Sequence, residues 1–366
     1  MRPNLRLKGE YDYGLMLIVA AIITMGLFAI YSAAYQKYIL SGTNLSLRQL
    51  NSAIIGIVVA VLVFRTGYQR LIDFGYYLFA INIMLLVLVL VIGDVRYGAR
   101  RWIEIGSFAF QPSEFAKITF VFALAKYLGG VRDQIEKPRA LMIPLAMAVV
   151  PMLLIFKEPD LGTSLIFIPV LFTMLLIAGA RLKHILLILG AGLLLAPFVW
   201  LFLKDYQRAR LLVFLNPNAD PLGAGYTIIQ SKIAIGSGGL FGKGWLAGTQ
   251  NQLNFLPERH TDFIFSVVGE EWGFIGGAVL LWLYYRFIEK GMIIAQTTSD
   301  MYGKTLAYGM VTIFAVHIIV NIGMVCGLMP VVGLPLPFMS YGGSFLIMAL
   351  ACVGLLENVK HKRTVF

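Results

Sequence analysis

Four ionisable side chains stand together at the edge of a long apolar run. The stretch FLPERHTDFIF, residues 255–265, contains Glu258, Arg259, His260 and Asp262. The apolar run that follows has about twenty residues, enough to cross a bilayer. Ionisable groups at a membrane edge are costly, so they are candidates for binding or catalysis. A carboxylate can act as a general base, and basic side chains can bind an anionic substrate.

Asp262 supports two interpretations. It directly precedes an apolar helix, and Asp is a preferred N-cap residue at such a position. It could equally serve as a general base at the membrane edge. A helix N-terminus stabilises the carboxylate and lowers its basicity, whereas burial in an apolar rim disfavours the charged form. The sequence leaves both interpretations open, with Asp160 as the next candidate base.

No histidine spacing predicts a metal cage. The H-E-x-x-H motif is absent from the sequence, and His260 and Asp262 would diverge on a helix. A carboxylate-bound Mg²⁺ that is shared with substrate phosphates needs only one or two protein ligands, so such an ion stays possible in principle. The sequence also has no Gly-x-Ser-x-Gly elbow and no Cys–His pairing, so covalent nucleophilic catalysis has no support.

Three further charged segments accompany this stretch. Arg100 and Arg101 precede Trp102, which indicates an interfacial anchor or a site for an anionic headgroup. Glu114 and Lys117 are three residues apart on one helix face, where they can form a structural ion pair or a functional one. The segments are RYGARRWIEIGSFAFQPSEFAK (residues 96–117), KEPDLG with Glu158 and Asp160, and DYQRAR with Asp205, Arg208 and Arg210.

Composition indicates a membrane protein. Of 366 residues, 59% are hydrophobic and only 13% are charged, whereas soluble domains have about 45–50% apolar residues. The net charge of +11 is typical of cytoplasmic loops rich in Lys and Arg, so we expect no nucleic-acid partner. We therefore expect an all-α polytopic fold, a single integral membrane domain over residues 1–366.

Apolar windows of about 19 residues predict ten membrane helices. Their ranges are 14–35, 50–65, 71–92, 113–130, 140–156, 162–180, 184–203, 263–288, 304–328 and 343–358. The boundary between the fifth and the sixth rests on KEPDLG alone.

Basic residues predict the orientation. If the N-terminus lies inside, the inner segments carry a run of basic residues: Arg2, Arg6, Lys8, Arg65, Arg70, Lys126, Arg132, Lys137, Arg139, Arg181, Lys183, Arg286, Lys290, Lys304, Lys360, Lys362 and Arg363. An even helix count then places both termini in the cytoplasm. Segment 204–261 becomes an extracytoplasmic loop, which we expect to contain interfacial helices and a glycine-rich turn at GLFGKGW. This turn departs from the phosphate-loop pattern, so a tight surface turn is the favoured interpretation.

Several motifs together resemble one known family. They are RRW with FQPSEFAKI, EPDLGTS, DYQRAR, GTQNQLNFLPERHTDFIFSVVGEEWG and VVGLPLPFMSYGGS, spread from about Arg100 to Ser344. The chain is identified on these residues as a member of the SEDS family (shape, elongation, division and sporulation), nearest to its elongation branch. The resemblance implies a peptidoglycan glycosyltransferase of the bacterial cytoplasmic membrane that polymerises lipid II, with a divalent cation (Mg or Mn). It also implies a class B penicillin-binding protein and other elongation-complex membrane proteins as partners.

The resemblance also carries site residues. The essential aspartate of the family falls on Asp262, and its important Trp, Glu and Lys fall on Trp102, Glu114 and Lys117. Together with the charged segments, this predicts Asp262 as catalytic base and a substrate-binding set of Arg101, Trp102, Glu114, Lys117, Asp160, Arg208, Arg210, Arg259 and His260. Two other functions stay open: a lipid II flippase, which would need ionisable residues deep in helices, and a non-catalytic scaffold.

Overall fold

The protein forms a bundle of long helices in the computed structural model, which describes residues 11–96, 99–105, 108–131, 134–217, 220–223 and 225–362. Ten helices of at least 16 residues lie in this part of the chain, and they confirm the ten predicted ranges. They are α1 (Tyr13–Ala33), α3 (Leu45–Thr66), α5 (Gly75–Ile92), α6 (Pro112–Gly130), α7 (Met142–Lys157), α8 (Leu161–Ile177), α9 (Leu182–Phe202), α13 (Ile264–Thr297), α14 (Met301–Val325) and α15 (Gly343–Lys362).

Length and composition support a multi-pass membrane protein. Seven helical stretches among the described residues are long and apolar enough to cross a membrane, and α8 and the first part of α9 are shorter apolar helices. The remaining long helix, α6, carries Glu114, Lys117 and Lys126. Two short helices, α4 (Tyr68–Asp73) and the 3-10 helix η2 (Pro138–Leu141), connect successive long ones.

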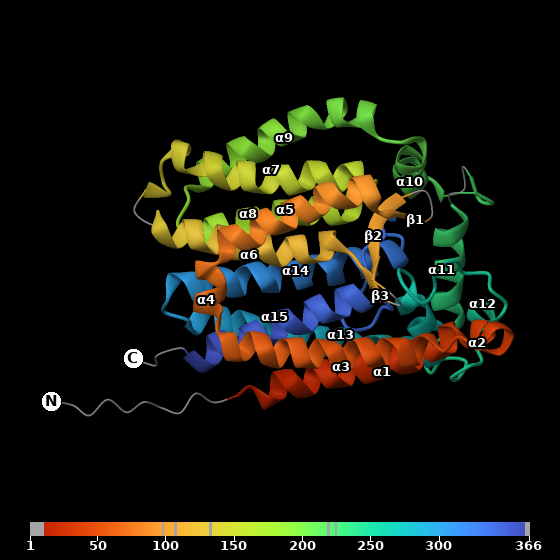
Figure 1. Ribbon diagram of the computed structural model, residues 1–366. Helices are drawn as coiled ribbons and strands as arrows, with labels where there is room; N and C mark the ends of the chain where they lie inside the picture. Colours follow the sequence, from red (N-terminus) through yellow and green to blue (C-terminus); the bar gives the residue numbers. More distant parts are fainter. Residues whose placement is uncertain are drawn as a thin grey trace.

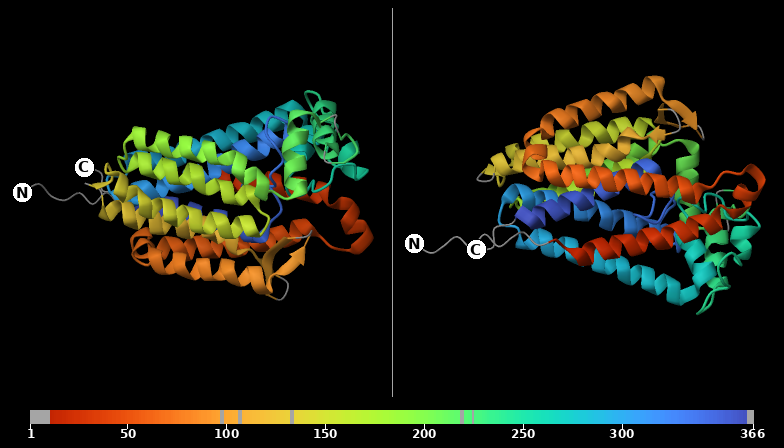
Figure 2. Two further views of the ribbon diagram at one scale, coloured as in Figure 1. Left: turned by 90° about the horizontal axis from the view of Figure 1, so that it is seen from above. Right: turned by 60° about the horizontal axis from the view of Figure 1, so that its bottom comes forward.

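The helices lie side by side and alternate in direction (Figures 1 and 2). As a result, α1 begins and α15 ends at the same end of the bundle, called the terminal end below. Asp12 joins them there: its carboxylate accepts from Lys290 at 2.8 Å and pairs with Lys360 at 3.0 Å, and its amide donates to Glu357. The predicted basic residues Arg2, Arg6, Lys8, Arg132 and Arg363 lie outside the described residues.

The opposite end, called the loop end, carries most of the short elements (Figure 1). These are α2 (Tyr35–Ser41), α10 (Asp205–Leu215), α11 (Tyr226–Ser237), α12 (Thr249–Gln252) and a three-stranded sheet. Segment 204–261 therefore contains the short helices that its apolar stripes predicted. The helix α9 lies at the edge of the bundle, and Ile185 is the only one of its described side chains among the buried hydrophobic residues.

The sheet was not predicted. It consists of β1 (Asp94–Arg96), β2 (Ala99–Ile105) and β3 (Phe108–Phe110) in antiparallel order β1-β2-β3, with Ile103 opposite Phe110. Windows of helical length average over such short strands, and the sequence interpretation considered only the charges of this segment. The sheet leads directly into α6, whose first residue is Pro112, a favourable position for proline.

The glycine-rich turn at 238–245 docks onto an interruption of α13. Gly273 has φ 64° and is not helical, so the backbone groups around it need other partners. Lys243 and Gly244 donate their amides to the carbonyls of Glu270 and Glu271 at 3.0 Å each, while Phe274 and Ile275 donate to Gly239 and Leu240. Two amides of this turn are thus bound to α13, which agrees with the predicted tight turn.

Between α14 and α15 the chain is not helical, yet it lies inside the bundle. Leu334, Leu336, Phe338, Met339 and Ser340 of this segment are buried. Irregular backbone is tolerated at such depth only where protein groups satisfy it. Tyr284 of α13 donates to the carbonyl of Pro337 at 2.6 Å, and side chains of α14 bond others nearby.

Candidate active site

A cavity of about 340 Å³ opens at the loop end, a volume within the usual range for ligand sites. Its walls come from α10, α11, the turn before α13 and the segment after α14. The lining residues are Tyr206, Ala209, Arg210, Thr227, Ile228, Pro257, Glu258, Asp262, Phe263 and Val331. Of the predicted site residues, Asp262 and Arg210 therefore meet in one cavity.

Asp262 lies in the turn before α13 and does not cap it. The N-cap residue of α13 is Phe263, and no side chain bonds the amides of the first turn. The capping interpretation is therefore wrong, and the half-buried carboxylate faces the cavity instead. Burial raises the pKa of Asp262 to about 6, the nearby Glu258 carboxylate adds to the rise, and Arg210 opposes it. A carboxyl with this pKa is a stronger base than an ordinary Asp and is still ionised at pH 7.

Arg210 is exposed in the cavity wall. Its guanidinium carbon lies 5.6 Å from the ring centroid of Tyr206, close enough for a cation–π contact. Glu258 faces the same cavity and has a left-handed backbone, with φ 48°, while its carboxylate accepts from Thr261 at 3.1 Å. The cavity thus combines two carboxyl groups and a cation.

Arg101 holds a turn together. Its guanidinium donates to the carbonyls of Glu158 and Pro159 at 3.0 and 2.5 Å and pairs with Asp160 at 3.5 Å. Asp160 also caps α8 by accepting from the amide of Thr163 at 3.1 Å, and Tyr206 donates to the carbonyl of Pro159. With these bonds made, Asp160 is a poor candidate base, and Arg101 joins β2 to the α7–α8 turn beside the cavity.

The remaining predicted site residues at the loop end are not among the residues that line the cavity. Arg208 donates to the carbonyls of Trp200 and Leu201 at the end of α9 and pairs with Asp205 at 3.7 Å. Arg259 donates to the carbonyl of Ala33 at 2.6 Å. Burial lowers the pKa of His260, and its carbonyl accepts from the amide of Tyr341. Trp102 stands in β2 opposite Asp94. Substrate contacts by these residues stay predictions.

Glu114 and Lys117 form the predicted ion pair, at 2.8 Å, and they lie in the core of the bundle. Their side chains are only 3% and 1% exposed, so no surface ligand reaches them in this conformation. The ammonium of Lys117 also lies 3.0 Å from Nε2 of His317 and 5.1 Å from the ring centroid of Phe345. Their role in substrate binding stays a prediction, whereas their structural pairing is confirmed.

Comparison with known proteins gives the family. A family profile described as "Cell cycle protein" and named for FtsW, RodA and SpoVE matches residues 13–365. The chain belongs to the FtsW/RodA/SpoVE family. This confirms the recognition from the motifs, because relatives named RodA, FtsW and the RodA-like MrdB are among the matches.

Two relatives and two solved structures illustrate the match. The peptidoglycan glycosyltransferase MrdB of Escherichia coli K12 is 42% identical over 362 residues, which cover 97% of this chain and 95% of MrdB. The peptidoglycan glycosyltransferase RodA of Treponema pallidum is 34% identical and covers 98% of this chain and 100% of that relative. The rod shape determining protein RodA of Thermus thermophilus has TM-score 0.73 and 31% identity, with both chains covered fully. A structure titled "Structural coordination of polymerization and crosslinking by a peptidoglycan synthase complex" has TM-score 0.83 and 38% identity over 96% of this chain and 98% of that one.

Three polar residues of this family member escaped the sequence-based selection. Glu158 is fully buried, and neither of its carboxyl oxygens has a hydrogen-bond partner. Burial and the Asp160 carboxylate raise its pKa to about 9, so it is protonated at neutral pH. His317 and Asn321, both on α14, were not selected either. His317 and Asn321 stand four residues apart on an apolar helix, and a polar pair at this spacing is a signal that could have identified these two residues.

Arg210 is predicted to bind an anionic part of the substrate. Arg210→Ala should raise the substrate concentration for half-maximal glycan formation about tenfold, which corresponds to about 1.4 kcal/mol, because the cavity loses its lining cation. Arg208→Ala is the matched control, since Arg208 lies on the same helix but bonds the end of α9. Equal effects of both variants in steady-state kinetics would contradict the assignment.

Proposed function

We propose that the protein polymerises lipid II, a disaccharide-peptide on polyprenyl pyrophosphate, during cell elongation, with Asp262 as the general base. Peptidoglycan glycosyl transfer is the activity that the names of its relatives carry, and the chain is a peptidoglycan glycosyltransferase of the same family. The observation that supports the choice of base is the Asp262 carboxylate, which faces a cavity together with Arg210 at one end of a membrane-spanning bundle.

The chemistry follows from these two side chains. Asp262 takes the proton from the attacking hydroxyl of the acceptor sugar. The oxygen of this hydroxyl forms a bond to the anomeric carbon of the donor, and the bond from that carbon to the pyrophosphate oxygen breaks. Arg210 stabilises the negative charge of the departing lipid pyrophosphate. One base and a direct displacement imply inversion at the donor carbon.

The position of the cavity at the loop end suits a lipid-linked substrate. It lies at the loop end, beyond the apolar spans, so a sugar pyrophosphate can enter it while its polyprenyl tail stays in the bilayer. The rival flippase function needs free ionisable groups inside the helices. Here Lys117 contacts both Glu114 and His317, so these three groups are engaged with one another rather than free.

The decisive variant is Asp262→Asn. It preserves size but cannot accept a proton at neutral pH, so glycan polymerisation should fall roughly 10²–10⁴-fold. The measurement is the length distribution of glycan strands made by the purified protein from lipid II and a divalent cation, separated on a gel. A folded Asn variant that polymerises at the wild-type rate would show that the base lies elsewhere.

The pH profile is a second readout of the same assignment. The base must be deprotonated, and its pKa is raised to about 6. The rate should therefore increase with pH up to about 6 and level off above it, whereas an ordinary Asp would place this limb near pH 3.9. Asp262→Glu keeps a carboxylate, so its rate should also rise with pH and then level off, with a lower maximal rate.

A divalent cation, Mg²⁺ or Mn²⁺, is part of the proposal. Glu258 and Asp262 line the same cavity and offer carboxylate oxygens, which suits an ion that also binds substrate phosphates. In the described ranges no group of three His, Cys, Asp or Glu could complete a site alone. When bound, the ion would supply positive charge to the leaving pyrophosphate. Chelation should abolish polymerisation, and Glu258→Gln should raise the Mg²⁺ concentration required; an unchanged requirement would exclude Glu258 as a ligand.

We assign the terminal end to the cytoplasm and the loop end, with segment 204–261, to the outside of the bacterial cytoplasmic membrane. The support is the basic residues of the terminal-end segments, among them Arg65, Arg181, Lys183 and Lys360. In a Cys326→Ser background, Leu222→Cys should react with an impermeant maleimide in intact cells, and Lys137→Cys only after permeabilisation. Both positions are exposed. The reverse pattern would invert the topology.

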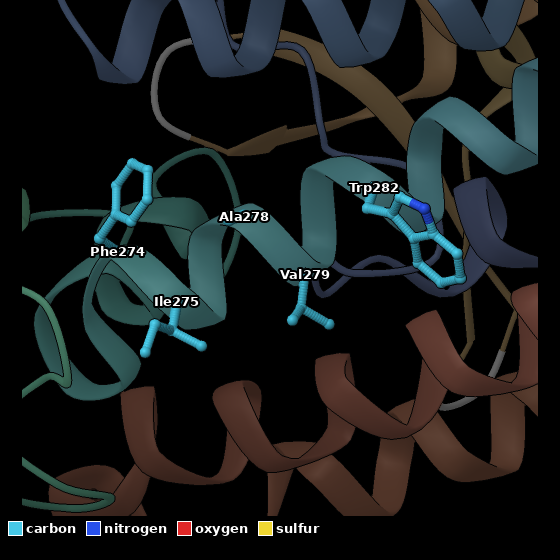
Figure 3. A pocket seen from close by; sticks show the side chains of 5 residues that line it. All are labelled: Phe274, Ile275, Ala278, Val279 and Trp282. Carbon is cyan, nitrogen blue, oxygen red and sulfur yellow. The ribbon is translucent and has the colours of Figure 1, made fainter.

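For the partner, a class B penicillin-binding protein, the exposed groove on α13 is the proposed contact (Figure 3). Phe274, Ile275, Ala278, Val279 and Trp282 line this groove. Gly276 and Gly277 of the same helix are not among the residues that line this groove, and Gly277 is buried. Other elongation-complex proteins are further expected partners without an assigned surface.

The partner assignment predicts a local effect. Val279→Trp should weaken co-purification with the transpeptidase, because the added ring fills the groove. Val87→Trp on α5 is the matched control, since both valines are 46% exposed on spanning helices. Undiminished co-purification of the Val279 variant would remove this face from the proposal.

A further inference from the structure

The turn that carries Asp262 rests on the non-helical segment between α14 and α15. Ser340 donates its hydroxyl to the carbonyl of Thr261 at 2.6 Å, and Tyr341 donates its amide to the carbonyl of His260 at 2.9 Å. Val331, in the same segment, lines the cavity. The segment therefore contacts the residues just before Asp262 and also forms part of the cavity wall.

Gly333 makes room for the carboxylate itself. A Cβ placed on Gly333 would lie 3.2 Å from Oδ2 of Asp262, which is tighter than most contacts of that kind. Its φ is +73°, a conformation that glycine adopts without steric cost. The absence of a side chain at this position thus defines where the Asp262 carboxylate can lie.

Asn321 ties the two backbones together. Its side chain is fully buried on α14, and its amide nitrogen donates to the carbonyl of Asp262 at 2.8 Å and to that of Leu334 at 2.7 Å. Both hydrogens of the amide are thereby used. One side chain holds residue 262 against the segment that contains Gly333.

His317, one helical turn earlier, holds the next residue of the segment. The carbonyl of Pro335 can only accept, so Nδ1 of His317 donates to it over 3.0 Å. Nε2 then accepts from Lys117 at 3.0 Å, and Lys117 pairs with Glu114. A continuous line of bonds therefore runs from Glu114 in the core to the segment that supports Asp262.

We propose that Asn321 and Gly333 are positioning residues that fix the Asp262 carboxylate in the cavity, and that Glu114, Lys117 and His317 act on catalysis through this segment. The proposal rests on the function of Asp262 as base. It gives Glu114 and Lys117, whose side chains are only 3% and 1% exposed, a role that needs no direct substrate contact. A base displaced by about 1 Å can cost a hundredfold in rate, so small shifts of this segment matter.

The experiment compares two variants with matched controls in lipid II polymerisation. Gly333→Ala crowds the carboxylate, whereas Gly42→Ala introduces an alanine at a similar φ, +66°, with nothing within 4 Å. Asn321→Leu removes both bonds, whereas Asn358→Leu removes an equally buried amide that donates to the carbonyl of Phe64 at the terminal end. Gly333→Ala and Asn321→Leu should lower kcat about ten- to hundredfold with KM within about threefold. The controls should keep the wild-type kcat, whatever their effect on the melting temperature.

The outcomes separate this proposal from the assignment of the base. If Asp262→Asn is inactive while Gly333→Ala and Asn321→Leu both keep the wild-type kcat, the positioning role is wrong and the base stands. If Asp262→Asn is active, the base assignment fails first. The proposal also requires that Gly333→Ala cause no further decrease in kcat in the Asp262→Asn background, and an additive decrease would overturn it. A change in KM alone for Gly333→Ala and Asn321→Leu would overturn it as well.

Discussion

Hydrocarbon offers a backbone amide or carbonyl no hydrogen-bond partner, and this constraint explains the contacts at two places where helical structure is interrupted. At Gly273 the helix α13 breaks, and a turn from outside the bundle supplies the missing donors and acceptors. Between α14 and α15 the chain leaves helical geometry, and Tyr284, His317 and Asn321 bond its carbonyls. Both interruptions lie toward the loop end, so the hydrogen bonds that stabilise the irregular backbone are made close to the cavity.

The same constraint sorts the charged residues into two groups. In the core Lys117 pairs with Glu114, and near the break in α13 the buried Glu270 pairs with Lys243. The carboxyl of the buried Glu158 has no hydrogen-bond partner, and its raised pKa leaves it uncharged at neutral pH. A buried charge without a partner would be strongly destabilising. At the cavity, by contrast, Arg210 and Asp262 lie in one lining and face the space that a ligand would occupy. Pairing thus distinguishes the residues that hold the bundle from those that are available for chemistry.

Much of this arrangement was predictable from the sequence, for identifiable reasons. The spans follow from apolar length, because about twenty residues are needed to cross a bilayer, and the alternation of spans places Asp262 and Arg210 at one end. The sheet at 94–110 was missed because its strands are shorter than any hydropathy window. Glu158, Asn321 and Gly333 were missed because their roles depend on contacts between segments distant in the chain. The capping interpretation of Asp262 failed because α13 starts one residue later than an Asp cap requires.

The break in α13 has a consequence for how this helix can evolve. In a continuous helix successive residues are rotated by about 100° about the axis, so the orientation of one face fixes the orientation of every later face. Here the turn at 238–245 bonds the two parts of α13 on either side of Gly273, and the part after Gly273 begins a new series of helical hydrogen bonds. The first segment starts two residues after Asp262, while the second bears the exposed groove around Ala278 and Val279. Selection on chemistry and selection on lateral association can therefore act on one helix as if it were two independent modules.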